Sequence, residues 1–137
     1  MPPEDVPQLQ DTAPPQLADD VDPDLGAVVL TFDQPMMDLS WSVQPLRRGG
    51  EWFPDLPDRP HYDASRRQCT IPVRLEAGRV YWIWVNSPIH RYFMTDDYRR
   101  AAPRALLFAT RTADGEPTPI PTELIECARR EIGRAHV

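Results

Sequence analysis

The residues best suited to catalysis lie close together in the sequence, at His61, Asp63 and Cys69. A thiol beside a histidine and a carboxylate can act as a nucleophile, but it must be a thiolate in an electropositive, accessible cleft. Cys69 instead alternates with Ile71 and Val73, which predicts that its side chain turns into a core. Carboxylate pairs for glycoside hydrolysis stay open, because nothing in the sequence selects one pair. We therefore predict that the chain is not an enzyme.

Three aspartates form the weak candidate for a metal site. Asp20, Asp22 and Asp24 stand at alternating positions, and Ca²⁺ prefers several carboxylate oxygens as ligands. The stretch does not follow the EF-hand pattern, because Leu25 stands where that loop needs glycine and Thr31 where it needs a bidentate glutamate. A solvated acidic linker is the default interpretation, and calcium between neighbouring modules is the alternative.

The remaining histidines and cysteines lack metal-ligand spacing. His90 and His136 stand far from His61, and Cys69 and Cys127 are too few for a disulfide framework. We predict that Cys69 is a small buried apolar residue and Cys127 a thiol of the tail. No metal and no cofactor are expected.

Four tryptophans are the strongest candidates for a binding role. Trp82 and Trp84 alternate with Tyr81 and would point to the outer face of a sheet, with Trp41 and Trp52 nearby. An exposed aromatic face marks an interface or a ligand platform. Two interpretations stay open: the face packs against the lead-in, a terminal helix or a neighbouring domain, or it binds a partner protein or a sugar.

The composition disfavours several kinds of partner. Fifteen arginines, no lysine and 21 acidic residues give a net charge of −6, which speaks against nucleic acid and anionic membranes. The longest apolar run, Ala105 to Ala109, is far too short to be inserted across a membrane. The first residues lack the basic and then apolar pattern of a signal peptide, so the chain as written carries no export signal.

Alternating apolar residues predict a chain of short strands. Clear alternation covers 26–32, 69–75, 80–86 and 105–111, and weaker strands are expected at 9–11, 37–43 and 61–63. In the 37–43 strand Leu39 and Trp41 would share one face. Seventeen prolines, three of them within 54–60, belong in loops and edges. About seven short strands separated by turns predict an all-β fold, an immunoglobulin-like (Ig-like) β-sandwich.

Three parts are expected along the chain. Residues 1–24 form an extended lead-in rich in proline and aspartate, 25–112 form the sandwich together with a strand from about residue 9, and 113–137 form a tail. In the tail, Leu124 and Ala128 recur at helical spacing behind Thr122, which can cap a helix, so a short helix is expected there.

The last six residues, 132–137, have the sequence Ile-Gly-Arg-Ala-His-Val. One reading frame of a common sequencing adapter encodes the same six residues followed by a stop codon. We therefore expect that this segment is an adapter artefact and that the natural protein is longer. A genomic read across the gene tests this hypothesis.

The turn before residues 80–86 resembles the tyrosine corner of sandwich domains. Leu75, Gly78 and Tyr81 match its spacing, with Ala77 in place of the usual proline. Glycine permits the tight turn, while the tyrosine ring enters the core and its hydroxyl bonds to a backbone group. The resulting register, with the alternation of the neighbouring strands, places inside the residues Tyr81, Ile83, Val85, Phe32 and Phe108, and outside the residues Val80, Trp82 and Trp84.

Four segments stand in a characteristic order. They are Val21-Asp22-Pro23, then Leu30-Thr31-Phe32-Asp33-Gln34-Pro35-Met36, then Tyr62 with Arg67-Gln68-Cys69-Thr70-Ile71-Pro72-Val73, and finally Leu106-Leu107-Phe108-Ala109-Thr110. Together they resemble the bacterial Ig-like domains of surface-layer proteins, of the SbsA type, over about residues 9–111. Asp33 replaces the usual serine, and the tail has no counterpart. The resemblance implies an extracellular or cell-surface location.

The expected function is that of a non-catalytic structural or adhesive module that spaces or presents other domains in a larger bacterial surface or exported protein. Its partners would be neighbouring domains of that protein or another surface protein, and polysaccharide stays open as a partner. The alternative is a ligand- or carbohydrate-binding accessory domain that uses Trp82, Trp84, Trp41 and Trp52. Fold alone does not decide between these functions.

Overall fold

The part of the chain that the structure describes folds into seven strands followed by one helix. The computed structural model describes residues 6–135, with side chains up to Arg130. The elements are β1 (Leu9–Ala13), β2 (Ala27–Phe32), β3 (Val43–Gln44), β4 (His61–Tyr62), β5 (Gln68–Pro72), β6 (Val80–Val85), β7 (Arg104–Ala109) and α1 (Thr122–Ala135).

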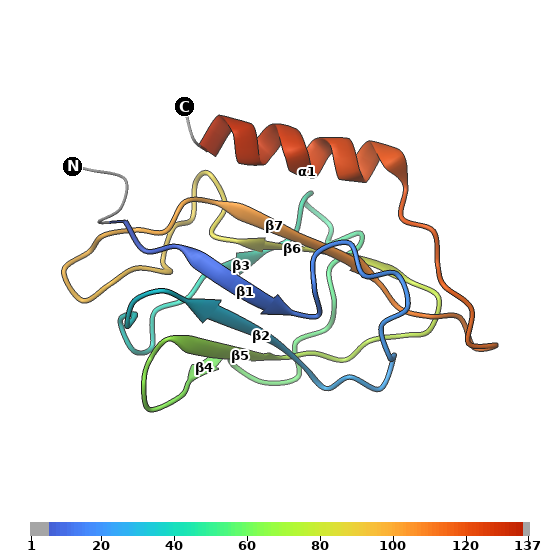
Figure 1. The fold of residues 1–137 in the computed structure, drawn as a ribbon, viewed down its shortest axis with the longest axis horizontal. Helices are drawn as coiled ribbons and strands as arrows, with labels where there is room; N and C mark the ends of the chain where they lie inside the picture. Colours follow the sequence, from blue (N-terminus) through green and yellow to red (C-terminus); the bar gives the residue numbers. More distant parts are fainter. Residues whose placement is uncertain (1–5, 136–137) are drawn as a thin grey trace.

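The strands form two antiparallel sheets that face each other (Figure 1). One sheet has the order β1-β2-β5-β4 and the other β3-β6-β7. These are the two strand orders of a constant-type immunoglobulin domain, whose first, second, fifth and fourth strands face its third, sixth and seventh. The predicted Ig-like β-sandwich is therefore confirmed, including the terminal helix.

The core lies between the two sheets and follows the predicted alternation. In β6 the side chains of Tyr81, Ile83 and Val85 belong to this core, while Trp82 and Trp84 belong to a second apolar cluster on the outer side. Neighbouring strands contribute the same way, since alternate residues of a strand point to opposite faces. The inward residues of the other long strands are Val28, Leu30, Phe32, Cys69, Ile71, Leu106 and Phe108.

The strand predicted over 37–43 is wrong except at its end. Only Val43 pairs with β6, and the preceding residues form a loop. Leu39 has a φ of 64° and is 88% exposed, whereas Trp41 packs against the core. The apolar alternation was misleading because a tight turn, closed by the Ser40 amide donating to the Met37 carbonyl, replaces the ladder.

The lead-in pairs first with one sheet and then with the other: β1 pairs with β2, and the residues after it bond to β7. After β1 the chain turns at the cis peptide Ala13–Pro14 and runs beside β7, where the Leu17 amide donates to the Leu107 carbonyl and the Ala109 amide to the Ala18 carbonyl. At the start of this run the Gln16 side chain takes the place of a strand backbone: its Nε2 donates to the Ala105 carbonyl over 2.8 Å, and its Oε1 accepts from the Leu107 amide over 2.7 Å.

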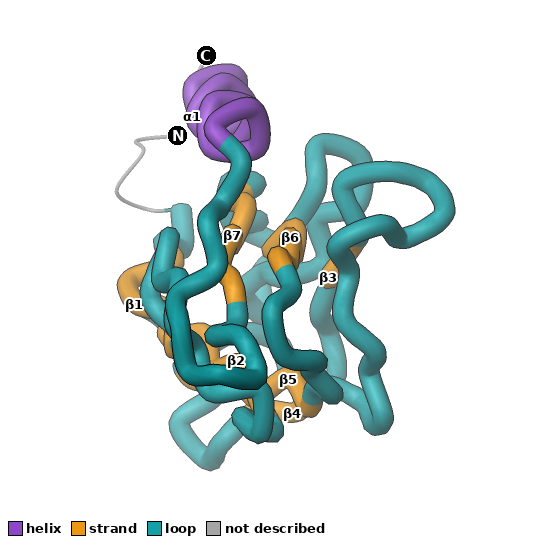
Figure 2. Tube along the Cα trace, turned by 90° about the vertical axis from the view of Figure 1, so that its right-hand side faces the viewer, coloured by secondary structure: helices purple, strands orange, loops and turns teal. Residues whose placement is uncertain are grey.

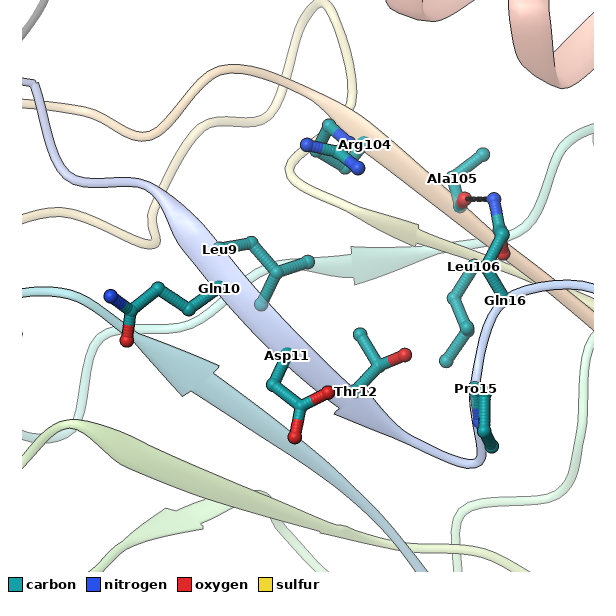
Figure 3. Close-up of a pocket in the computed structure, with 9 residues that line it drawn as sticks. All are labelled: Leu9, Gln10, Asp11, Thr12, Pro15, Gln16, Arg104, Ala105 and Leu106. Carbon is teal, nitrogen blue, oxygen red and sulfur yellow. Dashed lines mark hydrogen bonds between the residues drawn. The ribbon is translucent and has the colours of Figure 1, made fainter.

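A cleft of about 220 Å³ remains in the seam between β1 and β7. In Figure 3 Gln16 closes one end of it, Leu106 lines it from β7, and Gln10 points away from it. The seam is therefore bridged by one side chain rather than by a continuous ladder.

Helix α1 returns across the outer face of the β3-β6-β7 sheet (Figures 1 and 2). Its buried side chains, Leu124 and Ala128, are four residues apart and so lie on one face of the helix. The backbone of residues 132–135 forms the last turn of α1, but the side chains of the adapter-like segment lie outside the described part of the chain.

Candidate interaction surface

The two tryptophans of β6 point outward as predicted, but they are not exposed. Trp82 is 0% exposed and Trp84 5%, and their rings lie 5.5 Å apart in an edge-to-face arrangement. Leu124 and Ala128 of α1 complete the cluster around them. Of the two interpretations, packing against the terminal helix is the one that this geometry supports.

The other two tryptophans lie elsewhere. Trp52 packs at the border of the outer cluster, with the Arg47 guanidinium 5.4 Å from its ring centre and its carbonyl accepting from the Trp82 amide. Trp41 packs against the core between the sheets. The expected exposed face of four tryptophans is therefore wrong, because a helix and a loop cover half of it and the sandwich interior takes Trp41.

One polar group in this outer cluster has no partner. The indole Nε1 of Trp82 is buried without a hydrogen bond, although other buried polar side-chain atoms of the described residues find partners. A buried donor left unpaired costs about 1–3 kcal/mol. The Trp82 indole is therefore held by apolar contacts and by no hydrogen bond of its own.

The tyrosine corner is built by contacts on both sides of the turn. The Glu76 amide donates to the Tyr81 hydroxyl over 2.8 Å, and the Tyr81 ring lies 5.6 Å from that of Phe108. Gly78 has a φ of 67°, the left-handed region that glycine adopts without strain. Thr110, which the sequence did not single out, is fully buried and donates through its hydroxyl to the Glu76 carbonyl over 2.6 Å.

The residues considered for catalysis do not come together. Cys69 is fully buried on the inner face of β5, and burial raises the pKa of its thiol to about 12. His61 is exposed and pairs with Thr70, the neighbour of Cys69 that points to the opposite face. The thiol is protonated and faces away from the imidazole, so this set cannot act as a nucleophile and base.

The three aspartates do not form a calcium site. Asp22 accepts a hydrogen bond from the Asp24 amide and lies 3.4 Å from a guanidinium nitrogen of Arg111. Within the described residues no three histidine, cysteine or acidic side chains are grouped as metal ligands. The weak calcium candidate at Asp20, Asp22 and Asp24 is therefore not supported, because the Asp22 carboxylate is taken up by the Asp24 amide and Arg111.

The most exposed apolar side chains lie on two loops that the sequence did not select. Five large apolar or aromatic side chains of the described residues are exposed, and four of them belong to the β2–β3 and β6–β7 loops. We call these four the loop surface: Leu39 at 88% exposed, Ile89 at 82%, Tyr98 at 67% and Tyr92 at 49%. Exposed apolar groups on neighbouring loops are typical of an interaction site.

A buried asparagine holds the β6–β7 loop in shape. The Asn86 side chain is fully buried, donates to the carbonyls of Phe93 and Ala101, and accepts from the Phe93 amide. Its backbone has a φ of 56°, which asparagine tolerates better than most residues. A side chain thus replaces the backbone pairing that this long connection lacks.

The loops at this end also bond to one another. The Met37 amide donates to the Met94 carbonyl over 2.7 Å, and the Ser42 hydroxyl donates to the His90 carbonyl over 2.9 Å. Arg66, in the β4–β5 turn, forms an ion pair with Asp96 at 3.1 Å. The loop surface is consequently presented by a connected framework.

Backbone strain gathers in the same loops. Leu39 and Tyr98 have φ values of 64° and 65°, which cost energy for side chains of this size. Such strain persists where the surrounding structure enforces it, often at functional sites. The sequence offered one weak signal for these positions: each is a large apolar residue between two polar ones, although Leu39 was assigned to the strand predicted over 37–43.

The chain enters and leaves the sandwich near this surface. Leu9 at the start of β1 pairs with Phe32, the last residue of β2 before the β2–β3 loop. Helix α1 runs back over the sheet and ends on the same side of the molecule (Figure 1). Both ends of the described part of the chain therefore lie on the side of the molecule that carries the loop surface.

The chain is thus an Ig-like β-sandwich with an apolar loop surface. No family model and no curated protein match it. Two solved structures are similar in fold: the S-layer protein rSbsC(31-844), at 12% identity and a TM-score of 0.47, and domains 1–6 of the surface layer protein SbsC, at 12% identity and 0.48. Each alignment covers 77% of this chain, which spans 14% of the length of those proteins. The likeness is too distant to assign a family.

The described helix is not a membrane-crossing element. It lacks the combination of length and apolar character that such a helix needs.

Proposed function

We propose that the chain is a non-catalytic structural module of a larger bacterial surface or exported protein, and that its loop surface packs against a neighbouring domain of that protein. The observation that carries the proposal is the coincidence of two features at one end of the sandwich. The four exposed side chains Leu39, Ile89, Tyr92 and Tyr98 lie there, and β1 starts and α1 ends there.

A neighbouring domain tethered at this end meets the loop surface at high effective concentration. A short linker raises that concentration to the millimolar range, so even a small apolar contact becomes populated. Interfaces between domains of one chain are of this modest kind. The exposed apolar groups would then be covered in the parent protein.

The shape of the loops supports a docking role. Asn86 and the bonds between the β2–β3 and β6–β7 loops fix the surface before any partner arrives. A prearranged surface loses less conformational freedom on binding. The buried state of Trp82 and Trp84 removes the platform on which the carbohydrate-binding alternative depended.

Hydrogen exchange tests the proposal by comparing the chain alone with the longer parent protein that the proposal assumes. We expect amides of 37–40 and 92–98 to exchange at least about ten-fold more slowly in the longer protein, since a docked domain protects them. The double variant Leu39→Ser/Tyr98→Ser should abolish this difference and leave the melting temperature of the isolated chain within about 2 °C, because both side chains are exposed.

Leu17→Ser is the matched control, since Leu17 is the fifth exposed large apolar residue among those described and lies beside β7. It should leave the protection unchanged. Equal exchange rates in the longer protein and the isolated chain would overturn the proposal. Protection that appears only on adding a separate surface protein would assign the loop surface to adhesion instead.

A further inference from the structure

An open groove of about 650 Å³ lies at the end of β3, where Gln44 of β3 and its partner Trp84 of β6 both line it. The Ser87–His90 turn forms one wall and the start of the β3–β4 loop forms the other. We call it the arginine groove, and the side chains that matter to its chemistry are Leu46, Arg47, Arg48, Trp84, Ile89 and His90.

The groove is basic in a chain that is acidic as a whole. Its described lining includes two arginines and a histidine but no carboxylate. Arg47 and Arg48 are exposed and take part in no ion pair with the described acidic residues, while Arg47 is held against the Trp52 ring. Leu46 and Ile89 supply apolar walls. The ligand that fits has carboxylates next to an apolar side chain.

The same chain carries such a segment. The first 46 residues contain nine acidic residues and no basic one, whereas all fifteen arginines follow. Leu17 is 38% exposed, and the side chains of Asp19, Asp20 and Asp24 beyond it are exposed and form no described ion pair. We call these four residues the acidic face.

The acidic face and the arginine groove lie on opposite edges of one sheet. The sheet order is β3-β6-β7, the groove borders β3, and Leu17 and Val21 bond to the outer side of β7. The acidic face of one copy therefore cannot reach its own groove without unfolding. It can reach the groove of another copy.

We propose that the arginine groove binds the acidic face of a second copy of this chain. Because the two surfaces differ, the contact is head-to-tail and repeats from copy to copy until a ring closes. The proposal goes beyond the proposed function: it concerns another partner than the neighbouring domain, and a surface that shares only Ile89 with the loop surface.

The lining favours a protein segment over a sugar. Trp84 is 5% exposed and offers little of its ring for stacking, and the charged side chains of the lining are donors only. Arginines pair well with carboxylates, and charge complementarity between surfaces speeds and orients association.

Sedimentation of the chain at increasing concentration tests the proposal. We expect the average mass to rise between about 10 µM and 1 mM at low salt, the range of weak protein contacts, and the rise to shrink at about 0.5 M NaCl, where exposed charges are screened. Arg47→Glu/Arg48→Glu should weaken association at least about ten-fold. The control Arg59→Glu/Arg67→Glu makes the same charge change at exposed arginines outside the groove and should leave association unchanged.

A charge-swap pair makes the test specific. Asp19→Arg/Asp20→Arg alone should weaken association to a similar extent, because its groove and its former acidic face are then both basic. Mixed with Arg47→Glu/Arg48→Glu, it should restore association, since each variant now offers what the other lacks. Circular dichroism of each variant alone verifies that it is folded.

Three results would overturn the proposal: a monomer at all concentrations, association that Arg47→Glu/Arg48→Glu leaves intact, or a mixture that stays monomeric. A labelled peptide of residues 15–25 that binds the groove while the chain stays monomeric would also overturn it, by showing that the acidic partner is another protein. Leu39→Ser/Tyr98→Ser should not affect self-association, so failure of this proposal and failure of the loop-surface proposal are distinguishable.

Discussion

Tyr81 ties the turn before β6 to the interior of the sandwich. Its ring packs beside Phe108, and its hydroxyl accepts the hydrogen bond of the Glu76 amide. Without the hydroxyl this amide would face the side of an aromatic ring. A backbone donor that loses its only partner at a partly buried site destabilises the folded state.

Tyr81→Phe should therefore lower the free energy of unfolding by about 1–2 kcal/mol, the usual cost of removing one partner of such a bond. Urea unfolding followed by fluorescence measures this change. Tyr92→Phe is the control, because Tyr92 is 49% exposed; it should leave the midpoint unchanged. Equal midpoints for Tyr81→Phe and the unmodified chain would show that water satisfies the Glu76 amide.

The residue scale is also where sequence reasoning worked best. Alternation in β6 assigned Tyr81 and Trp82 to opposite faces, and the two apolar clusters confirm that assignment. Burial could not be predicted from alternation, because it depends on what covers the outward face. Asn86 was missed for a related reason: a buried asparagine is identified by the carbonyls around it, and these come from residues up to 15 positions away.

Helix α1 is the element that buries the outward-facing tryptophans of β6. The sequence predicted a helix from the spacing of Leu124 and Ala128, but local spacing does not say which surface a helix covers. The helix docks because its apolar side and the outer face of β6 each remove the other from water. Neither the apolar side of α1 nor the Trp82–Trp84 pair has another described partner of comparable size.

The strand predicted over 37–43 was wrong for the same reason: local spacing carries no information about contacts with distant segments. Period-two alternation is the signal for a strand, and Leu39 and Trp41 satisfy it. Hydrogen bonds to the distant β6–β7 loop, at Met94 and His90, determined the backbone instead. Contacts between segments far apart in the sequence overruled the local pattern.

Leu124→Asp should release α1 from the sheet while the sandwich remains folded. A carboxylate among the apolar side chains of the outer cluster would lose its hydration, so release of the helix costs less free energy than burial of the charge. Trp82 and Trp84 would then contact water, and the tryptophan emission maximum should shift to longer wavelength. The indole Nε1 of Trp82 would gain a water partner, which offsets part of the lost apolar contact.

Glu126→Gln on the exposed side of α1 is the matched control for this experiment and should leave the emission unchanged. Far-ultraviolet circular dichroism separates undocking from unfolding, since the strand signal persists in the first case. An unchanged emission maximum in Leu124→Asp would mean that another segment shields the tryptophans.

At the scale of the whole molecule, burial makes the folded state sensitive to alkali. Burial raises the pKa of Cys69 to about 12 and raises the pKa values of Tyr81 and Tyr62 above their usual range, with nearby Cys69 and Asp38 contributing at Tyr62. Each group is neutral when protonated, and each is more acidic in the unfolded chain. Their contribution is complete below the unfolded values, 9.0 for the thiol and 10.0 for the phenols, and is lost as the pH rises toward the folded values.

We therefore expect stability to be nearly constant between about pH 7 and 8.5 and to fall above about pH 9, by up to about 1.4 kcal/mol per pH unit for each group that has ionised in the unfolded chain. Urea midpoints at successive pH values measure the fall. Cys69→Ala should lower stability at neutral pH, because it leaves a small cavity, but should make the decline from pH 9 to 10 shallower. An identical decline in both proteins would show that the thiol does not contribute.

The seam between β1 and β7 also bears on how the protein ages. Gln16 occupies two backbone groups of the β7 edge with one amide, and an unoccupied edge is where foreign strands add and aggregates begin. Deamidation would turn that amide into a carboxylate, which can still accept from Leu107 but repels the Ala105 carbonyl. A single slow chemical change, with no mutation and no unfolding, would thus open the start of the β7 edge, while the backbone of the lead-in still covers the rest.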